Sequence, residues 1–131
     1  MIKNLYIKNY AIIKEVSINF EVGLNILTGE TGSGKSIIIQ TISILLGANF
    51  YKKNIRTDEE ECIIGGLIRF NNEDFNIKRI INNKGTSKNF LNKRSVTVDK
   101  IKQISSYFID LLFDIIGGFV GLIFMNKIKN D

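Results

Sequence analysis

The chain has 131 residues, of which 44% are hydrophobic and 24% are charged. This composition is typical of one globular domain with a hydrophobic core, and it excludes an intrinsically disordered chain. The sequence contains no histidine and one cysteine, Cys62. Histidine-based zinc sites, catalytic triads that use histidine and a disulfide framework are therefore excluded.

The net charge of +5 is unevenly distributed along the chain. Residues 1–66 carry seven basic and seven acidic side chains, whereas residues 67–131 carry eleven basic and six acidic ones. Isoleucine, asparagine and lysine make up 54 of the 131 residues, a bias typical of A/T-rich codons, so basicity alone is weak support for nucleic-acid binding. The N-terminus has no continuous apolar segment followed by a cleavage site, so we expect a cytoplasmic protein without a signal peptide.

Hydrophobic patterning predicts the first elements of the chain. Residues 2–8 and 12–20 alternate apolar and polar side chains, which predicts a β-hairpin. The apolar run 24–27 predicts a buried parallel strand. Residues 36–46 are apolar on nearly every side and predict a buried helix that ends at Gly47.

The second half of the chain reads as a series of strands. We expect residues 48–61 to form an exposed loop because they are mostly polar and end in the acidic run 58–61. Strands are predicted at 62–70, 74–81 and 88–92, and a short helix at 98–107. Cys62 lies in the first of these strands, where we expect a buried apolar side chain rather than a reactive thiol.

Residues 108–125 form the most apolar segment, with 16 of 18 residues apolar or glycine. A membrane-spanning helix needs about 20 such residues. Asp110 and Asp114 would be costly inside a bilayer, and the pair Gly117-Gly118 weakens a helix. We therefore favour a buried strand followed by an irregular apolar tail over a membrane span.

One motif carries recognisable chemistry. The stretch 29–36 matches the P-loop pattern G-x-x-x-x-G-K-[ST] at every fixed position, with residues Gly29, Glu30, Thr31, Gly32, Ser33, Gly34, Lys35 and Ser36. The glycines let backbone N–H groups surround a phosphate, Lys35 reaches the β- and γ-phosphates, and the Ser36 hydroxyl is placed to bind Mg²⁺. A helix that starts near Lys35 directs its positive end at the anion. The motif predicts a nucleotide-binding site.

Hydrolysis also requires an acidic residue that organises Mg²⁺ and water. The candidates for this Walker B position are Asp110 and Asp114, and both follow imperfect apolar runs. We find no convincing catalytic residue and leave open whether the chain is an enzyme. By itself we expect it to show only background ATPase activity.

A basic stretch, residues 76–102, has eight lysine or arginine side chains against Asp99. Its lysines and arginines are compatible with a DNA phosphate backbone or with an ordinary solvated surface. The candidate DNA contacts are Lys84, Lys88, Lys93 and Arg94.

With these residues in view, the chain resembles the RecN family of SMC-like bacterial DNA repair ATPases. Residues 23–36, GLNILTGETGSGKS, are close to that family's P-loop, and the pair Glu30-Thr31 favours RecN over other SMC heads. The likeness continues through 55–57, 84–92, 96–98 and 104–110. It covers about residues 1–110, and the tail 111–131 does not match the family.

The resemblance implies an α/β fold, namely the N-terminal lobe of an ABC/SMC-like P-loop NTPase head with an added antiparallel β-subdomain, here incomplete. It implies ATP and Mg²⁺ as cofactors, DNA and a second head as partners, double-strand break repair as the function, and a nucleoid-associated location. The Q-loop glutamine, signature motif and Walker B carboxylates of the family are absent, which indicates a truncated or frame-shifted copy. Two alternatives stay open: a stand-alone small P-loop NTPase, and a membrane-associated nucleotide-binding protein through residues 108–125.

Overall fold

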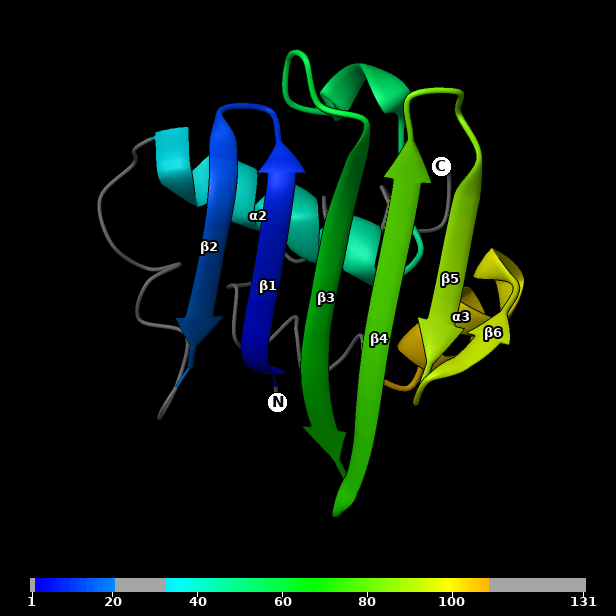
Figure 1. The fold of residues 1–131 in the computed structure, drawn as a ribbon. Helices are drawn as coiled ribbons and strands as arrows, with labels where there is room; N and C mark the ends of the chain where they lie inside the picture. Colours follow the sequence, from blue (N-terminus) through cyan, green and yellow to red (C-terminus); the bar gives the residue numbers. More distant parts are fainter. Residues whose placement is uncertain (1, 21–32, 109–131) are drawn as a thin grey trace.

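The computed structural model describes residues 2–20 and 33–108, which form a six-stranded sheet with two α-helices (Figure 1). The strand order is β2-β1-β3-β4-β5-β6, and every neighbouring pair is antiparallel. The elements in chain order are β1 (Ile2–Tyr10), β2 (Ile13–Asn19), α2 (Ser33–Leu45), the 3-10 helix η1 (Lys52–Asn54), β3 (Glu61–Phe70), β4 (Glu73–Asn82), β5 (Ser87–Leu91), β6 (Arg94–Val96) and α3 (Val98–Ser105).

Most of the predicted elements are confirmed. The N-terminal hairpin is β1 and β2, and the three later strands are β3, β4 and β5. The helix predicted at 36–46 begins three residues earlier, and the helix predicted at 98–107 ends at Ser105. The predicted strand 24–27, the tail 111–131 and most of the apolar segment 108–125 lie outside the described residues.

Tight turns connect the strands of the second half. Asn71 and Asn72, between β3 and β4, have φ values of 52° and 61°. Two consecutive positive φ values define the turn whose twist matches a β-hairpin, and asparagine tolerates them. Asn92 and Lys93 repeat this geometry between β5 and β6, with φ values of 50° and 70°. The sequence analysis missed β6 because three residues are too few to show an alternating pattern.

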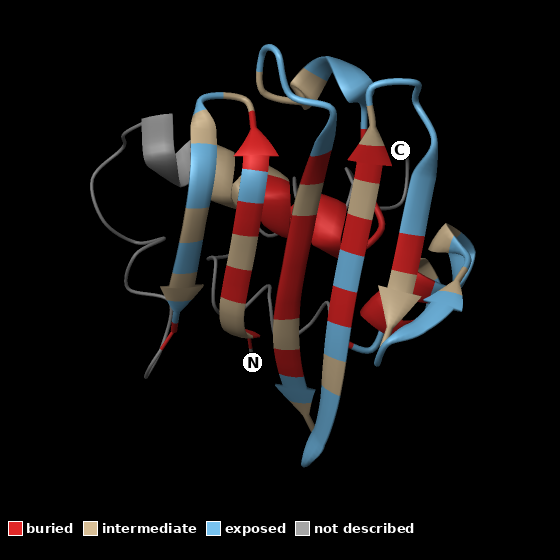
Figure 2. Cartoon of the chain, in the orientation of Figure 1, coloured by how far each residue is buried: buried red, intermediate tan, exposed pale blue. Residues whose placement is uncertain are grey.

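The helices cover one face of the sheet, and the hydrophobic core lies between the two layers (Figure 2). Leu5, Ile64 and Ile77 project from β1, β3 and β4 into this core and are fully buried. The buried side chains of the helices include Ile42, Leu45 and Ile101. Phe108, just after α3, packs its ring edge-on against Phe70 and Phe75. The opposite face of the sheet carries no described element.

The prediction of a fully exposed loop at 48–61 was wrong in part. Ala48 and Phe50 are buried, and Tyr10 forms an isolated antiparallel bridge with Ile55. The backbone of Asn54 accepts a hydrogen bond from the N–H of Ala11, which ties η1 to the first hairpin. The acidic residues 58–61 at the end of the segment are exposed, as expected.

Among the described residues, no helix is long and apolar enough to cross a membrane.

Candidate nucleotide-binding site

The second half of the predicted P-loop forms the first turn of helix α2. Ser33, Gly34, Lys35 and Ser36 belong to this turn, whereas Gly29, Glu30, Thr31 and Gly32 lie outside the described residues. The first backbone N–H groups of a helix have no partner within the helix, and they point along its axis toward any bound anion. No acidic residue occurs in the first turn, so nothing there opposes a phosphate.

Burial holds α2 in place despite its poor helix propensity. Ile37, Ile38 and Ile39 are β-branched residues that disfavour a helix, yet all three pack against the core. Ile42 and Leu45 are fully buried against the sheet. The close approach of Leu45 to β3 requires Gly66, because a Cβ there would lie 2.8 Å from Leu45 Cδ2.

The C-terminal end of α2 is closed by a Schellman motif. The N–H of Ala48 bonds to the carbonyl of Ser43 at 3.0 Å, and that of Gly47 bonds to the carbonyl of Ile44 at 3.0 Å. Gly47 has a φ of 116°, which confirms it as the predicted residue after the helix. The helix that carries Lys35 therefore has a defined end.

Arg79 is the polar anchor between this helix end and the sheet. Its Nη1 donates hydrogen bonds to the carbonyl oxygens of Ile44 and Ala48, and its Nε donates to Asn89 Oδ1 at 2.8 Å. The guanidinium also lies 5.6 Å from the ring centre of Phe50. Burial lowers the pKa of Arg79 to about 10, so the side chain stays charged at neutral pH.

The place of Arg79 corrects the sequence analysis, which counted it in the basic stretch. The side chain is 3% exposed and turns toward α2, so DNA does not reach it. One of the eight basic residues of the stretch 76–102 is therefore buried and structural. A buried arginine was not predictable from a stretch that is otherwise exposed.

A second polar contact joins α2 to the first hairpin. Gln40 lies in the middle of α2, and its Oε1 accepts a hydrogen bond of 3.1 Å from the hydroxyl of Tyr10 on β1. Burial raises the pKa of Tyr10, so the hydroxyl keeps the proton that it donates.

The candidate DNA contacts are exposed but do not meet at one point. Lys84 lies in the turn before β5, Lys88 lies on β5, and Lys93 and Arg94 follow its other end. Lys84 precedes β5 and Lys93 follows it, so the length of β5, about 13 Å, lies between these two positions. The four positions are therefore spread along β5 and the turns at its two ends.

Other sequence candidates are not assembled into sites. Cys62 is fully buried, and burial raises the pKa of its thiol to about 12, which confirms an unreactive apolar role. Among the residues that the structure describes, no three acidic or cysteine side chains are grouped to hold a metal ion. Asp110 and Asp114, the Walker B candidates, lie outside these residues.

Comparison with known proteins defines the class of protein to which this chain belongs. The family model of the AAA domain matches residues 4–121, and the chain belongs to this family of P-loop ATPases. The structure agrees with this class, because the last four residues of the P-loop sequence, 33–36, form the first turn of a helix that packs against the sheet.

Individual relatives show which proteins of this class the chain resembles. The DNA repair protein RecN of Bacillus subtilis (strain 168) is 34% identical over 128 residues, covering 85% of this chain and 22% of that protein. RecN of Halalkalibacterium halodurans is 32% identical over 128 residues, covering 85% and 23% respectively. These matches confirm the resemblance to the RecN head. The chain spans less than a quarter of the length of these relatives.

A solved structure confirms the fold. It is described as "Structural biochemistry of ATP-driven dimerization and DNA stimulated activation of SMC ATPases", and it superimposes with a TM-score of 0.66. The match covers 97% of this chain and 98% of that one at 19% identity. At this identity the likeness defines the fold, an SMC-like ATPase lobe.

Proposed function

We propose that this chain is the ATP-binding N-terminal lobe of a RecN-like protein of DNA double-strand break repair. The observation that carries the proposal is the complete P-loop sequence 29–36, whose last four residues form the first turn of helix α2. The similarity to RecN proteins supports the repair function, since those relatives are described as DNA repair proteins.

The residues present fit a nucleoside triphosphate with Mg²⁺. The first turn of α2 supplies N–H groups without a competing carboxylate, and a 13-residue helix has a substantial dipole. Lys35 would hold the β- and γ-phosphates and Ser36 the Mg²⁺ ion. The bound metal would neutralise phosphate charge. Arg79 holds the C-terminal end of the same helix against the sheet.

Calorimetric titration with MgATP tests the nucleotide site. We expect Lys35→Ala to abolish measurable binding, because the side chain that neutralises the phosphates is lost. Lys100→Ala is a matched control, since Lys100 is exposed on α3, away from the P-loop helix. Binding by Lys35→Ala equal to that of the parent chain would disprove the assignment.

DNA is the partner in this proposal, with Lys84, Lys88, Lys93 and Arg94 as contacts to phosphate. Their exposure and their spread along β5 suit an extended backbone. Each phosphate contact contributes about 0.9 to the slope of log K against log salt for duplex DNA. The triple variant with Lys84, Lys88 and Lys93 changed to Gln should therefore lower that slope by up to about 2.7. An unchanged slope would show that these lysines do not contact DNA phosphates.

The remaining parts of the proposal concern assembly and organisation. A second head would complete the ATP site, and residues 1–110 would form the lobe, with 111–131 as a separate tail. A nucleoid-associated location in the cytoplasm follows from the DNA partner. Analytical ultracentrifugation with and without MgATP tests the pairing of heads.

A further inference from the structure

The sheet face opposite the helices carries aromatic and basic side chains. In Figure 1 this face is toward the viewer, with α2 behind it. The strand register aligns Tyr6, Gly65, Lys78 and Phe90 in one row across β1, β3, β4 and β5. Directly paired residues share a face of the sheet, so these side chains project to the same side.

Two hollows lie side by side along this row. The first, about 350 Å³, is lined by Asn76, Lys78, Phe90 and Lys93. The second, about 370 Å³, lies between Tyr6 and Lys78 over Gly65. Gly65 has no side chain to fill the second hollow, and Lys78 separates the two. Each hollow therefore combines an aromatic wall with a lysine ammonium group.

Positive charge dominates the middle of this face. Lys8, Lys78 and Lys88 project from β1, β4 and β5, and Lys93 adjoins the first hollow. No ion pair involving these lysines occurs in the described part of the chain.

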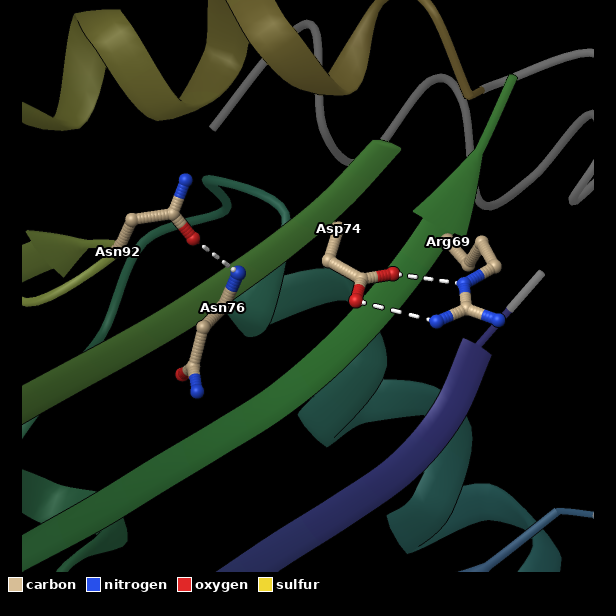
Figure 3. Close-up of polar contacts among 4 residues, drawn as sticks. All are labelled: Arg69, Asp74, Asn76 and Asn92. Atoms are coloured by element: carbon tan, nitrogen blue, oxygen red, sulfur yellow. Dashed lines mark hydrogen bonds and ion pairs between the residues drawn. The ribbon is translucent and has the colours of Figure 1, made fainter. Parts of the chain in front are cut away.

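The carboxylates near this face of the sheet either bond to other side chains or lie away from the two hollows. Asp74 accepts hydrogen bonds from Arg69 Nε at 2.7 Å and Nη2 at 3.2 Å (Figure 3), and the guanidinium lowers the pKa of that carboxyl. Glu15 on β2 lies directly opposite Lys8 in the strand register and accepts a hydrogen bond from the Tyr6 hydroxyl, so the excess of positive charge lies at Lys78, Lys88 and Lys93. Glu61 lies at the end of β3.

The rim of the first hollow is held by the backbone. Asn92 Oδ1 accepts a hydrogen bond of 2.8 Å from the N–H of Asn76 (Figure 3), and the N–H of Asn92 donates to the carbonyl of Asn76 at 2.7 Å. These two hydrogen bonds fix the turn at Asn92 and Lys93, both of which have positive φ values, and so hold Lys93 beside Phe90. The hollow is therefore formed before any ligand arrives.

We propose that this face binds single-stranded DNA, with one base stacked on Phe90, another on Tyr6, and the intervening phosphates beside Lys78 and Lys93. The proposal rests on the proposed function and adds to it the form of DNA and the residues that contact the bases. Aromatic stacking combined with lysines along a groove is the general means by which proteins hold single strands. Tyr6 and Phe90 are three strand spacings apart, about 14 Å, so a strand of several nucleotides spans both.

The chemistry favours a single strand over a duplex or an acidic peptide. Duplex bases are stacked on one another and reach a protein ring only after unstacking. An acidic peptide would use the lysines but gain nothing specific from two flat aromatic walls. The Asn76 carboxamide at the shared rim of the two hollows is suited to hydrogen bonds with a base edge.

Fluorescence anisotropy of the full chain with labelled oligonucleotides tests this. We expect a 12-nucleotide poly-dT strand to bind at least 5-fold more tightly than an abasic strand of the same length and charge, because each stacked base contributes about 1–3 kcal/mol. Phe90→Leu should weaken poly-dT binding about 5- to 100-fold and leave abasic binding unchanged. Gly65→Val, which fills the second hollow without removing charge, should also weaken poly-dT binding.

Matched controls separate stacking from charge and from misfolding. Tyr107→Leu removes an exposed aromatic ring after α3, and Lys100→Gln removes an exposed charge on α3, so both should bind poly-dT like the parent. Equal binding of poly-dT and abasic strands by the parent chain would overturn the proposal whatever the variants do. In that case salt-dependent duplex binding would still stand as support for the proposed function, whereas no binding to any DNA would remove both.

Discussion

Arg79 on β4 donates a hydrogen bond of 2.6 Å to the backbone carbonyl of Ala48, the residue whose N–H closes the C-terminal end of α2. A buried cation thus takes the place of solvent at the end of the helix that carries the P-loop lysine. No carboxylate pairs with Arg79 in the described residues; its hydrogen bonds go to neutral acceptors. The negative end of the helix dipole stabilises the charge.

Replacing Arg79 should therefore destabilise the lobe. In Arg79→Met the Ala48 carbonyl and Asn89 Oδ1 lose this donor, whereas the Ile44 carbonyl keeps its bond from the Gly47 N–H. Each unsatisfied group costs about 1–3 kcal/mol, offset by relief from burying a charge. We expect a net loss of about 2–4 kcal/mol in the free energy of unfolding, measured by urea denaturation. Lys78→Met, an exposed neighbour on the other face, should change it by less than about 0.5 kcal/mol. Equal effects of the two variants would contradict the anchoring role.

Gly66 and Gly65 provide a matched pair on β3. A Cβ at Gly66 would lie 2.9 Å from the carbonyl oxygen of Asn4 and 2.8 Å from Leu45, so Gly66→Ala should lose about 1–3 kcal/mol of stability. A Cβ at Gly65 would lie 3.5 Å from the nearest atom, the Ile77 carbonyl oxygen, which is an ordinary contact. Gly65→Ala should be close to neutral. Thermal denaturation followed by circular dichroism compares the two, and a larger loss at Gly65 would refute the packing of α2 on β3.

Cys62 should make stability depend on pH above about 9. Burial raises the pKa of the thiol from its ordinary value of 9.0 to about 12, so in this interval the unfolded chain loses a proton that the folded chain keeps. The contribution of the buried thiol to the free energy of unfolding is complete below pH 9. It then falls by about 1.4 kcal/mol per pH unit until the pH reaches the pKa of the thiol in the folded chain. The difference in unfolding free energy between the parent and Cys62→Ala should shrink at that rate between pH 9 and 10.5. A difference independent of pH would show that the thiol is not shielded in the folded state.

Thr97 caps helix α3, which presents Ile101 and Ile104 to the core. Its side-chain oxygen accepts a hydrogen bond of 3.1 Å from the N–H of Lys100. Thr97→Ala should cost about 1 kcal/mol, whereas Thr97→Ser keeps the acceptor and should cost much less. Urea denaturation of both variants checks this, and equal losses would mean that the hydroxyl does not act as a cap.

The regular elements were predictable wherever local rules decide them. The alternation of residues 74–81 reflects a sheet with one covered face, and β4 extends from Glu73 to Asn82. Gly47 was predictable as a helix end because a positive φ favours glycine. The loop 48–61 was only partly predictable, since Phe50 is buried beside residues distant in sequence, among them Arg79.

By itself, the sequence determined the P-loop pattern, the resemblance to the family and the positions of most strands along the chain, because these depend on residue identity and on periods of two or about four residues. The tertiary structure decided which charges serve structure and which face solvent. Lys78 and Arg79 are adjacent and both basic, yet one lies on the open face beside Phe90 and the other is buried under α2. Neighbouring residues in a strand point to opposite faces, and only the placement of the helices determines which face is the core.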